Sequence, residues 1–202
     1  MRIVIDGTTG SGKTTFLRGY SERSLDTRYF NMQDLGYVCF SELIRGTIKA
    51  RQEKSKDPFD DWYDFFKIAL DRGTDFFSQG KDEVSLFFYD RGLPYLEIMA
   101  QRYGVALPNR YYELCQDCRY DSPVFVFQPI KSYDDLHAHK LNPVRKKPYS
   151  LEERLCQHEH VKRTYEKWGY KVVEVPVFFD GNPNENNKKR YEFIMEHLNY
   201  EK

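Results

Sequence analysis

Short apolar runs alternate along the chain with longer segments in which apolar residues recur every three or four positions. Runs of the first kind are typical of buried strands, and the periodic segments are typical of amphipathic helices. The predicted strands are Ile3–Ile5, Tyr37–Phe40, Val84–Tyr89, Pro123–Phe127 and Lys171–Pro176. The predicted helices are Thr14–Tyr20, Leu43–Arg51, Phe59–Phe77, Leu93–Gly104, Tyr111–Cys118, Leu151–Trp168 and Lys189–Tyr200. Residues 180–188, rich in Asn, Gly and Pro, predict an exposed loop.

This alternation predicts an α/β fold of three layers, in which helices cover both faces of a mostly parallel, five-stranded sheet. Nothing in residues 1–202 resembles a linker or a repeat, so we expect one domain. Ligands of such sheets bind beyond the carboxyl ends of the strands. The residues expected at that edge include Asp6, Glu42, Asp90 and Gln128.

The first predicted strand leads into Gly7-Thr8-Thr9-Gly10-Ser11-Gly12-Lys13-Thr14, which matches the phosphate-loop pattern G-x-x-x-x-G-K-[ST] at every position. Glycines permit positive φ and let backbone N–H groups approach a polyphosphate. Lys13 would add positive charge at the β- and γ-phosphates, and Thr14 would hold Mg²⁺. The predicted nucleotide-binding residues are Gly7, Thr8, Thr9, Gly10, Ser11, Gly12, Lys13, Thr14 and Thr15. The alternative is a glycine-rich turn without a ligand, but the order of strand, loop and helix favours the phosphate site.

Asp90, Arg91 and Glu42 follow predicted strands at the same edge. Asp90 ends an apolar run, as in a Walker-B strand, and could hold Mg²⁺ together with Thr14 or instead cap the next helix. Arg91 could bind a phosphate group or the phosphate acceptor. Glu42 is either a general base or acceptor-binding group, or a solvated residue in the first turn of a helix.

The segment 137–155 is polar and basic and is interrupted by two prolines, which predicts a flexible lid. Its basic residues are Lys140, Arg145, Lys146, Lys147 and Arg154. A mobile arginine can neutralise charge on a migrating phosphoryl group, and Arg145 is the candidate for this role. The alternative is a solvated run of charge.

The composition excludes some classes of protein. With 31 basic and 31 acidic residues, the chain has no overall attraction for nucleic acid or an anionic membrane. No apolar run approaches the length of a membrane span, and no signal segment opens the chain. The four cysteines are irregularly spaced, which predicts free thiols and a cytoplasmic location.

Two further patterns have competing interpretations. Cys115 and Cys118 form a C-x-x-C, and the other potential zinc ligands after them are His137, His139, Cys156, His158 and His160. A zinc site is disfavoured because the two cysteines lie in a predicted helix and no second C-x-x-C is present. Aromatic residues make up 16% of the chain, and we interpret Trp62 and Phe66 as core residues, with a base-stacking pocket as the alternative.

Several segments resemble a family of small P-loop ATPases. They are 90–95 (DRGLPY), the YG and LP pairs at 103–104 and 107–108, 119–129 (RYDSPVFVFQP), the basic segment and 165–176 (YEKWGYKVVEVP). That family is grouped by sequence near nicotinamide-riboside-kinase domains and shares the nucleoside and nucleotide kinase architecture. The resemblance implies a kinase-like fold with Lys13, Thr14 and Asp90 at an ATP–Mg²⁺ site, Arg91 nearby and Arg145 in the lid. The Asp6-Gly7 opening and the Asp90-Arg91 pair also resemble thymidylate kinases.

These patterns together predict an ATP- and Mg²⁺-dependent phosphotransferase for a small nucleoside- or nucleotide-type acceptor. Lys13, Arg91, Glu42 and Arg145 would act in catalysis, and Thr14 and Asp90 would hold the metal. The neutral net charge disfavours a kinase of polynucleotide or modified-base hydroxyls. A nucleotide-switched regulatory ATPase or interaction module is the alternative from another class, and the chain lacks the N/T-K-x-D motif of GTPases. A homodimer and the choice between ATP and GTP stay open.

Overall fold

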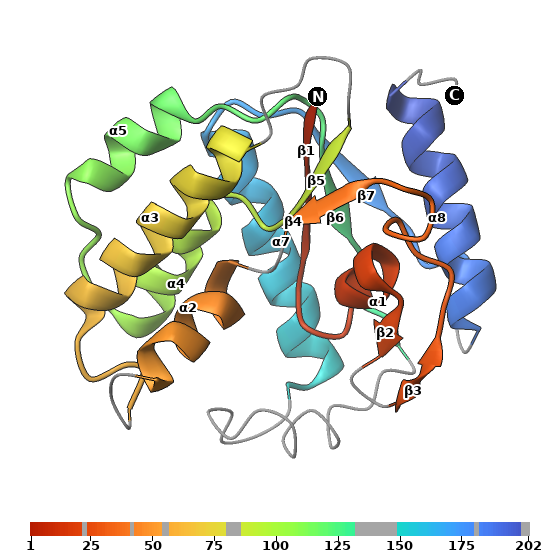
Figure 1. Ribbon diagram of the computed structural model, residues 1–202, viewed down its shortest axis with the longest axis horizontal. Coiled ribbons are helices and arrows are strands. Elements are labelled where there is room, and N and C mark those ends of the chain that lie inside the picture. The colour runs from red at the N-terminus through yellow and green to blue at the C-terminus, as the bar shows by residue number, and fades with distance from the viewer. Residues whose placement is uncertain are drawn as a thin grey trace.

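The computed structural model describes residues 1–21, 24–40, 43–53, 57–79, 86–131, 149–179 and 182–198. At its centre is a five-stranded parallel sheet with the strand order β4-β5-β1-β6-β7 (Figure 1). The strands are β1 (Arg2–Gly7), β4 (Val38–Phe40), β5 (Phe87–Asp90), β6 (Val124–Phe127) and β7 (Val172–Val175). The predicted α/β class and its five parallel strands are confirmed.

Helices cover both faces of this sheet (Figure 1). On one face α1 (Lys13–Arg18) packs against α8 (Pro183–Leu198), and on the other α7 (Leu151–Lys167) contacts β1, β6 and β7. A further group of helices lies beside α7, where α4 contacts α7, α2 contacts α3, and α3 contacts α5. These helices are α2 (Leu43–Gln52), α3 (Trp62–Gln79), α4 (Tyr95–Tyr103) and α5 (Arg110–Asp117).

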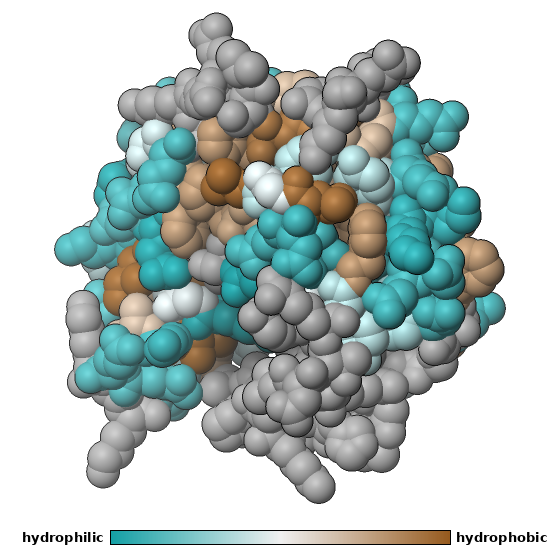
Figure 2. Space-filling model, turned by 45° about the vertical axis from the view of Figure 1, so that its right-hand side comes forward, coloured by the Kyte–Doolittle hydropathy of each residue, from teal (hydrophilic) through white to brown (hydrophobic). Residues whose placement is uncertain are grey.

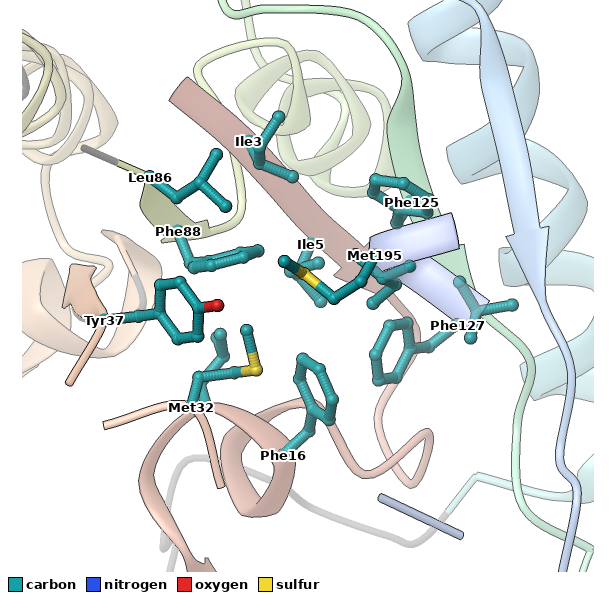
Figure 3. Close-up of a cluster of buried hydrophobic side chains, with 13 residues drawn as sticks. Ile3, Ile5, Phe16, Met32, Tyr37, Leu86, Phe88, Phe125, Phe127 and Met195 are labelled. Atoms are coloured by element: carbon teal, nitrogen blue, oxygen red, sulfur yellow. The ribbon is translucent and has the colours of Figure 1, made fainter. Parts of the chain in front are cut away.

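Successive residues of the central strands point to opposite faces, and this divides the core. On one face Ile3 and Ile5 of β1 share a buried cluster with Phe16 of α1, which Figure 3 shows. On the other face Val4 of β1 belongs to a second buried cluster, together with Val161 of α7. Because both faces are covered, the strands are apolar at nearly every position, as the sequence predicted.

The aromatic residues of α3 belong mainly to the core. Phe66 is fully buried, and the Trp62 ring packs against its cluster with 5.9 Å between the two ring centroids. The interpretation of this helix as core is confirmed.

The prediction of an exposed loop over residues 180–188 is wrong for the described part of that segment. Helix α8 begins at Pro183, and the Asn182 Oδ1 accepts a hydrogen bond from the Glu185 N–H at 3.2 Å. An Asn cap followed by Pro in the first turn is a helix start, because the ring fixes a helical φ and needs no N–H partner there.

The first helix is shorter than predicted. It ends at Arg18 because Gly19 has a φ of 76° and donates its N–H to the Thr15 carbonyl at 2.9 Å. An antiparallel pair of short strands follows, β2 (Tyr20–Ser21) and β3 (Ser24–Arg28), and neither is among the predicted strands.

The surface is mixed in character. The face in Figure 2 has apolar residues near its centre, with hydrophilic residues on both sides. Among the helices that the structure describes, none is both long and apolar enough to cross a membrane.

Candidate functional site

The loop between β1 and α1 lies at the carboxyl edge of the sheet, where it turns the chain from the strand into the helix (Figure 1). The φ angles of Gly7, Gly10 and Gly12 are 138°, 76° and 83°. A Cβ on Gly7 would lie 2.6 Å from the carbonyl oxygen of Phe127 on β6, so no larger residue fits between these strand ends. This conformation is the one that the phosphate-loop pattern predicted.

The Lys13 ammonium lies inside this loop and is almost fully buried. Its Nζ donates to the carbonyl oxygens of Gly7 at 2.7 Å and Thr8 at 3.0 Å, and to Ser11 Oγ at 3.3 Å. The three acceptors belong to the loop itself, so they hold the ammonium at the place where the phosphate-loop pattern puts the charge for a polyphosphate.

Asp90 lies at the strand end next to the loop. In the parallel pair of β5 and β1, Asp90 is opposite Ile5, and the Arg91 N–H donates to the Ile5 carbonyl at 3.1 Å. Only 2% of Asp90 is exposed. A carboxylate here and the Thr14 hydroxyl in the first turn of α1 are hard oxygen ligands, the kind that Mg²⁺ prefers. The donor chemistry at this edge therefore fits Mg²⁺.

Arg91 is held from two sides beside the loop. Its backbone has a φ of 74°, which is rare for a residue with a side chain. The Arg91 Nη1 lies 3.4 Å from Asp6 Oδ1, and the guanidinium carbon lies 3.7 Å from the centroid of the Tyr95 ring. Both contacts fix the guanidinium in one place, as a residue that binds anionic groups requires.

Asp6 is a fully buried carboxylate at the root of the loop. Its Oδ1 accepts a hydrogen bond from the Gly7 N–H at 2.6 Å, and its Oδ2 accepts one from the Tyr165 hydroxyl at 2.7 Å. The Tyr165 hydroxyl in turn accepts from the Gly92 N–H at 3.0 Å. One tyrosine of α7 thereby joins the end of β1 to the segment that carries Asp90 and Arg91.

Arg190 of α8 supports the loop and was not found by sequence reasoning. It is fully buried, with Nη1 donating to the Ser11 carbonyl at 2.7 Å and Nη2 donating to the Gln128 carbonyl at 3.4 Å. Burial lowers the pKa of Arg190 to about 9, which still leaves it charged at neutral pH. The sequence predicted a helix from Lys189 but gave no sign that Arg190 would be buried.

A family model described as an AAA domain matches residues 2–183 of the chain. The chain belongs to this AAA-domain family. The matched range includes the loop, Asp90 and Arg91, and it ends at the first residue of α8, so Arg190 lies outside it. No curated protein matches the chain.

The fold is also similar to a solved structure described as the NadR protein in complex with NR. The TM-score is 0.61 and the sequence identity is 18%, and the likeness covers 99% of this chain and 52% of that one. The AAA-domain chain thus spans about half the length of the protein it matches. At this identity the likeness shows the fold, and it confirms the predicted P-loop fold.

Some predicted site residues lie outside the described residues. Glu42 and Arg145 are among them, as are residues 137–148 of the predicted lid. The rest of that segment leads into α7, whose first turn is fixed by reciprocal hydrogen bonds between Ser150 and Glu153. Residues 151–155, which were assigned to the lid, are therefore the start of a helix.

Arg154, from the same basic segment, is buried in this first part of α7. Its Nη1 donates to the Ile130 carbonyl at 2.8 Å, and the Ile130 N–H donates to the Gly10 carbonyl at 3.0 Å. Arg154 is thus connected to the phosphate loop through one intervening residue, and it is not a solvated charge.

His137 and His139 lie outside the described residues, and the other candidate metal ligands have features that disfavour a metal. Burial raises the pKa of the Cys115 thiol to about 12, whereas a zinc ligand must be a thiolate. Within the described ranges, His158, Glu159 and Glu174 bring potential ligand atoms within 4.8 Å of one another. The Lys162 ammonium lies 3.0 Å from both carboxylates, so a cation already holds this position.

Proposed function

We propose that this chain is an ATP- and Mg²⁺-dependent phosphotransferase that acts on a small nucleoside- or nucleotide-type acceptor, as a single kinase-like domain. The observation that carries the proposal is the meeting of three groups at one sheet edge. The buried Lys13 ammonium lies within the loop, Asp90 ends the neighbouring strand, and Arg91 is fixed beside both by Asp6 and Tyr95.

Each group has a role in phosphoryl transfer, which requires positioning and neutralisation of charge rather than covalent catalysis. The loop N–H groups and Lys13 would bind the β- and γ-phosphates. Thr14 and Asp90 would hold Mg²⁺, which supplies charge neutralisation at the phosphates when bound. Arg91 would stabilise the migrating group or the acceptor, and Glu42 and Arg145 keep their predicted catalytic roles as part of this proposal.

The cysteines are consistent with a reducing compartment. Cys39, Cys115, Cys118 and Cys156 are all free thiols. We therefore include a cytoplasmic location in the proposal.

The test is a transfer screen with γ-labelled ATP. The purified chain is incubated with labelled ATP and Mg²⁺ in three separate reactions. One contains nucleosides, one contains nucleoside monophosphates and one contains oligonucleotides as acceptors. We expect label on a small acceptor, with no transfer when Mg²⁺ is removed by chelation. Slow release of free phosphate at a rate that no acceptor changes would contradict the proposal and favour a regulatory ATPase.

A further inference from the structure

A pocket of about 250 Å³ lies between α4 and α7 and reaches Thr8 of the phosphate loop. The two helices pack against each other, and α4 follows the Asp90-Arg91-Gly92 segment directly. Pockets for drug-sized ligands measure about 300–1,000 Å³, so this one suits a single small molecule. A ligand bound here would have one end at the loop that is proposed to hold the phosphates.

The walls of this pocket are mostly apolar. Ile98 and Met99 of α4 and Val161 of α7 line it, and Tyr95 contributes an aromatic ring. Apolar and aromatic walls of this kind bind a flat ring by burying its faces.

The polar groups of the pocket are amides and an imidazole. Gln101 comes from α4, and Gln157 and His160 come from α7. The buried Glu97 accepts a hydrogen bond from Gln101 Nε2 at 3.0 Å, which directs Gln101 Oε1 toward His160 Nε2 at 2.7 Å. His160 must then donate through Nε2, which leaves Nδ1 as an acceptor in the neutral ring.

The charge of the pocket lining distinguishes acceptors with a cationic ring from acceptors with an uncharged ring. Among the described residues that line the pocket, Arg102 is the one charged side chain and none is a carboxylate. The Tyr95 ring also has the Arg91 guanidinium 3.7 Å from its centroid. A cationic ring in this pocket would be repelled by the Arg102 guanidinium, and no carboxylate among the described lining residues would offset that repulsion.

We propose that this pocket binds the phosphate acceptor, and that the acceptor has an uncharged heteroaromatic ring whose edge groups hydrogen-bond to Gln101, Gln157 and His160. The acceptor end to be phosphorylated lies toward Thr8. This inference rests on the proposed phosphotransferase function and adds the acceptor class to it. A pyridinium nucleoside such as nicotinamide riboside, whose ring is a cation, belongs to the class that the pocket disfavours.

The first experiment compares acceptors of opposite ring charge. Adenosine, guanosine, cytidine, uridine and their 5′-monophosphates are each compared with nicotinamide riboside in the transfer assay. We expect one uncharged-ring acceptor to have a kcat/KM at least about tenfold above that of nicotinamide riboside. An equal or higher kcat/KM for nicotinamide riboside overturns the proposal.

The second experiment places a carboxylate in the pocket. Gln157→Glu adds a negative charge to its lining, and Leu155→Glu adds the same charge at an exposed position of the same helix that does not line it. We expect Gln157→Glu to shift the ratio of kcat/KM values toward nicotinamide riboside by about tenfold or more, with the KM for ATP unchanged. Leu155→Glu should leave the ratio unaltered. Identical ratios in the two variants would show that the acceptor binds elsewhere.

Calorimetric titration of nucleosides without ATP separates the two proposals. Binding that Gln157→Glu weakens, in a chain that transfers no phosphate, would support the pocket and contradict the phosphotransferase function. Transfer that proceeds normally in Gln157→Glu and His160→Ala would support the function and contradict the pocket. Absence of nucleoside binding together with active transfer to another acceptor class also overturns the pocket assignment.

Discussion

The Tyr165 hydroxyl donates a hydrogen bond to Asp6 Oδ2 at 2.7 Å, although the two residues are 159 positions apart in the chain. Both are fully buried, and the same hydroxyl accepts from the Gly92 N–H. Burial raises the pKa of Asp6, and the nearby charges of Arg91 and Lys13 and the Tyr165 hydrogen bond all act to lower it. This hydrogen-bond network joins the root of the phosphate loop to the segment that carries Arg91.

Tyr165→Phe should destabilise the chain by about 1–3 kcal/mol, because it removes a donor from a buried carboxylate and a partner from the Gly92 N–H. The pKa of Asp6 in the folded chain is already raised, so its ionisation costs stability as pH rises above about 3.9, its value in the unfolded chain. Loss of the hydroxyl raises that pKa further. The difference in unfolding free energy should therefore be larger at pH 7 than at pH 4, as measured by urea denaturation.

Tyr120→Phe is the matched control for that variant. The Tyr120 hydroxyl is also buried and accepts from the Leu93 N–H at 3.3 Å. It forms no hydrogen bond with Asp6, so its loss should cost stability without the added dependence on pH. The same pH dependence in both variants would contradict the role assigned to Asp6.

Lys13→Ala should lower ATP turnover by about 100-fold or more, because the side chain is proposed to neutralise developing charge on the phosphates. Lys49→Ala removes an exposed lysine from α2 and serves as the control for lost charge. Circular dichroism checks that both variants are folded. Undiminished turnover in a folded Lys13→Ala chain would remove the loop from the catalytic site.

Arg190→Lys should weaken ATP binding by about tenfold and lower stability, because an ammonium cannot reach the Ser11, Gln128 and Pro176 carbonyls together. Arg163→Lys makes the same change at an exposed position of α7 and should have no effect. Dissociation constants from titration with a fluorescent ATP analogue check both. A folded Arg190→Lys chain with unchanged affinity would show that α8 does not support the loop.

Glu174 should make the chain sensitive to acid. Burial acts to raise its pKa, but hydrogen bonds from His158, Lys162 and Gln128 outweigh burial and lower it to about 2. The stability that Glu174 contributes is therefore present above pH about 4.3, its ordinary value, and is lost as pH falls toward 2. Glu174→Gln should flatten this part of the stability profile, measured by denaturation at a series of pH values. A profile identical to the unaltered chain would refute the assignment.

Two glycines in helices should respond in opposite ways to alanine. A Cβ on Gly73 of α3 would lie 2.4 Å from Leu93 Cδ2, which is fully buried and cannot move aside, so Gly73→Ala should destabilise by about 1–3 kcal/mol. A Cβ on Gly46 of α2 would meet the guanidinium end of Arg72, which can rotate away. Gly46→Ala should therefore be neutral or stabilise by up to about 1 kcal/mol through helix propensity. The melting temperature of each variant, compared with that of the unaltered chain, shows whether the substitution stabilises or destabilises the fold.

The sequence predicted those parts of the site whose conformation depends on residues adjacent in the chain. The spacing of Gly7, Gly12 and Lys13 fixed the loop conformation, and the apolar run before Asp90 placed that carboxylate at a strand end. Arg190 and Tyr165 could not be found in this way, because their partners are defined only by how α7 and α8 pack on the sheet. Arg190 is also surrounded in sequence by polar residues, a pattern that indicates a solvated helix and conceals a buried cation.

The pocket was missed for the same reason. Its lining comes from the loop, α4 and α7, and neither helix has a motif that marks its facing side as a binding surface. The error over residues 180–188 has another origin. Asn and Pro favour both loops and helix starts, and only the hydrogen bond from the Glu185 N–H to Asn182 shows which applies.

The hydrogen bond from Arg190 to Ser11 spans 179 positions of the chain. On the ribosome the phosphate loop emerges before α8, which is the last helix of the described fold. A growing polypeptide would therefore display the complete loop sequence while lacking the guanidinium that supports its shape. The supported shape of the loop would then arise only after α8 has been synthesised and has packed on the sheet.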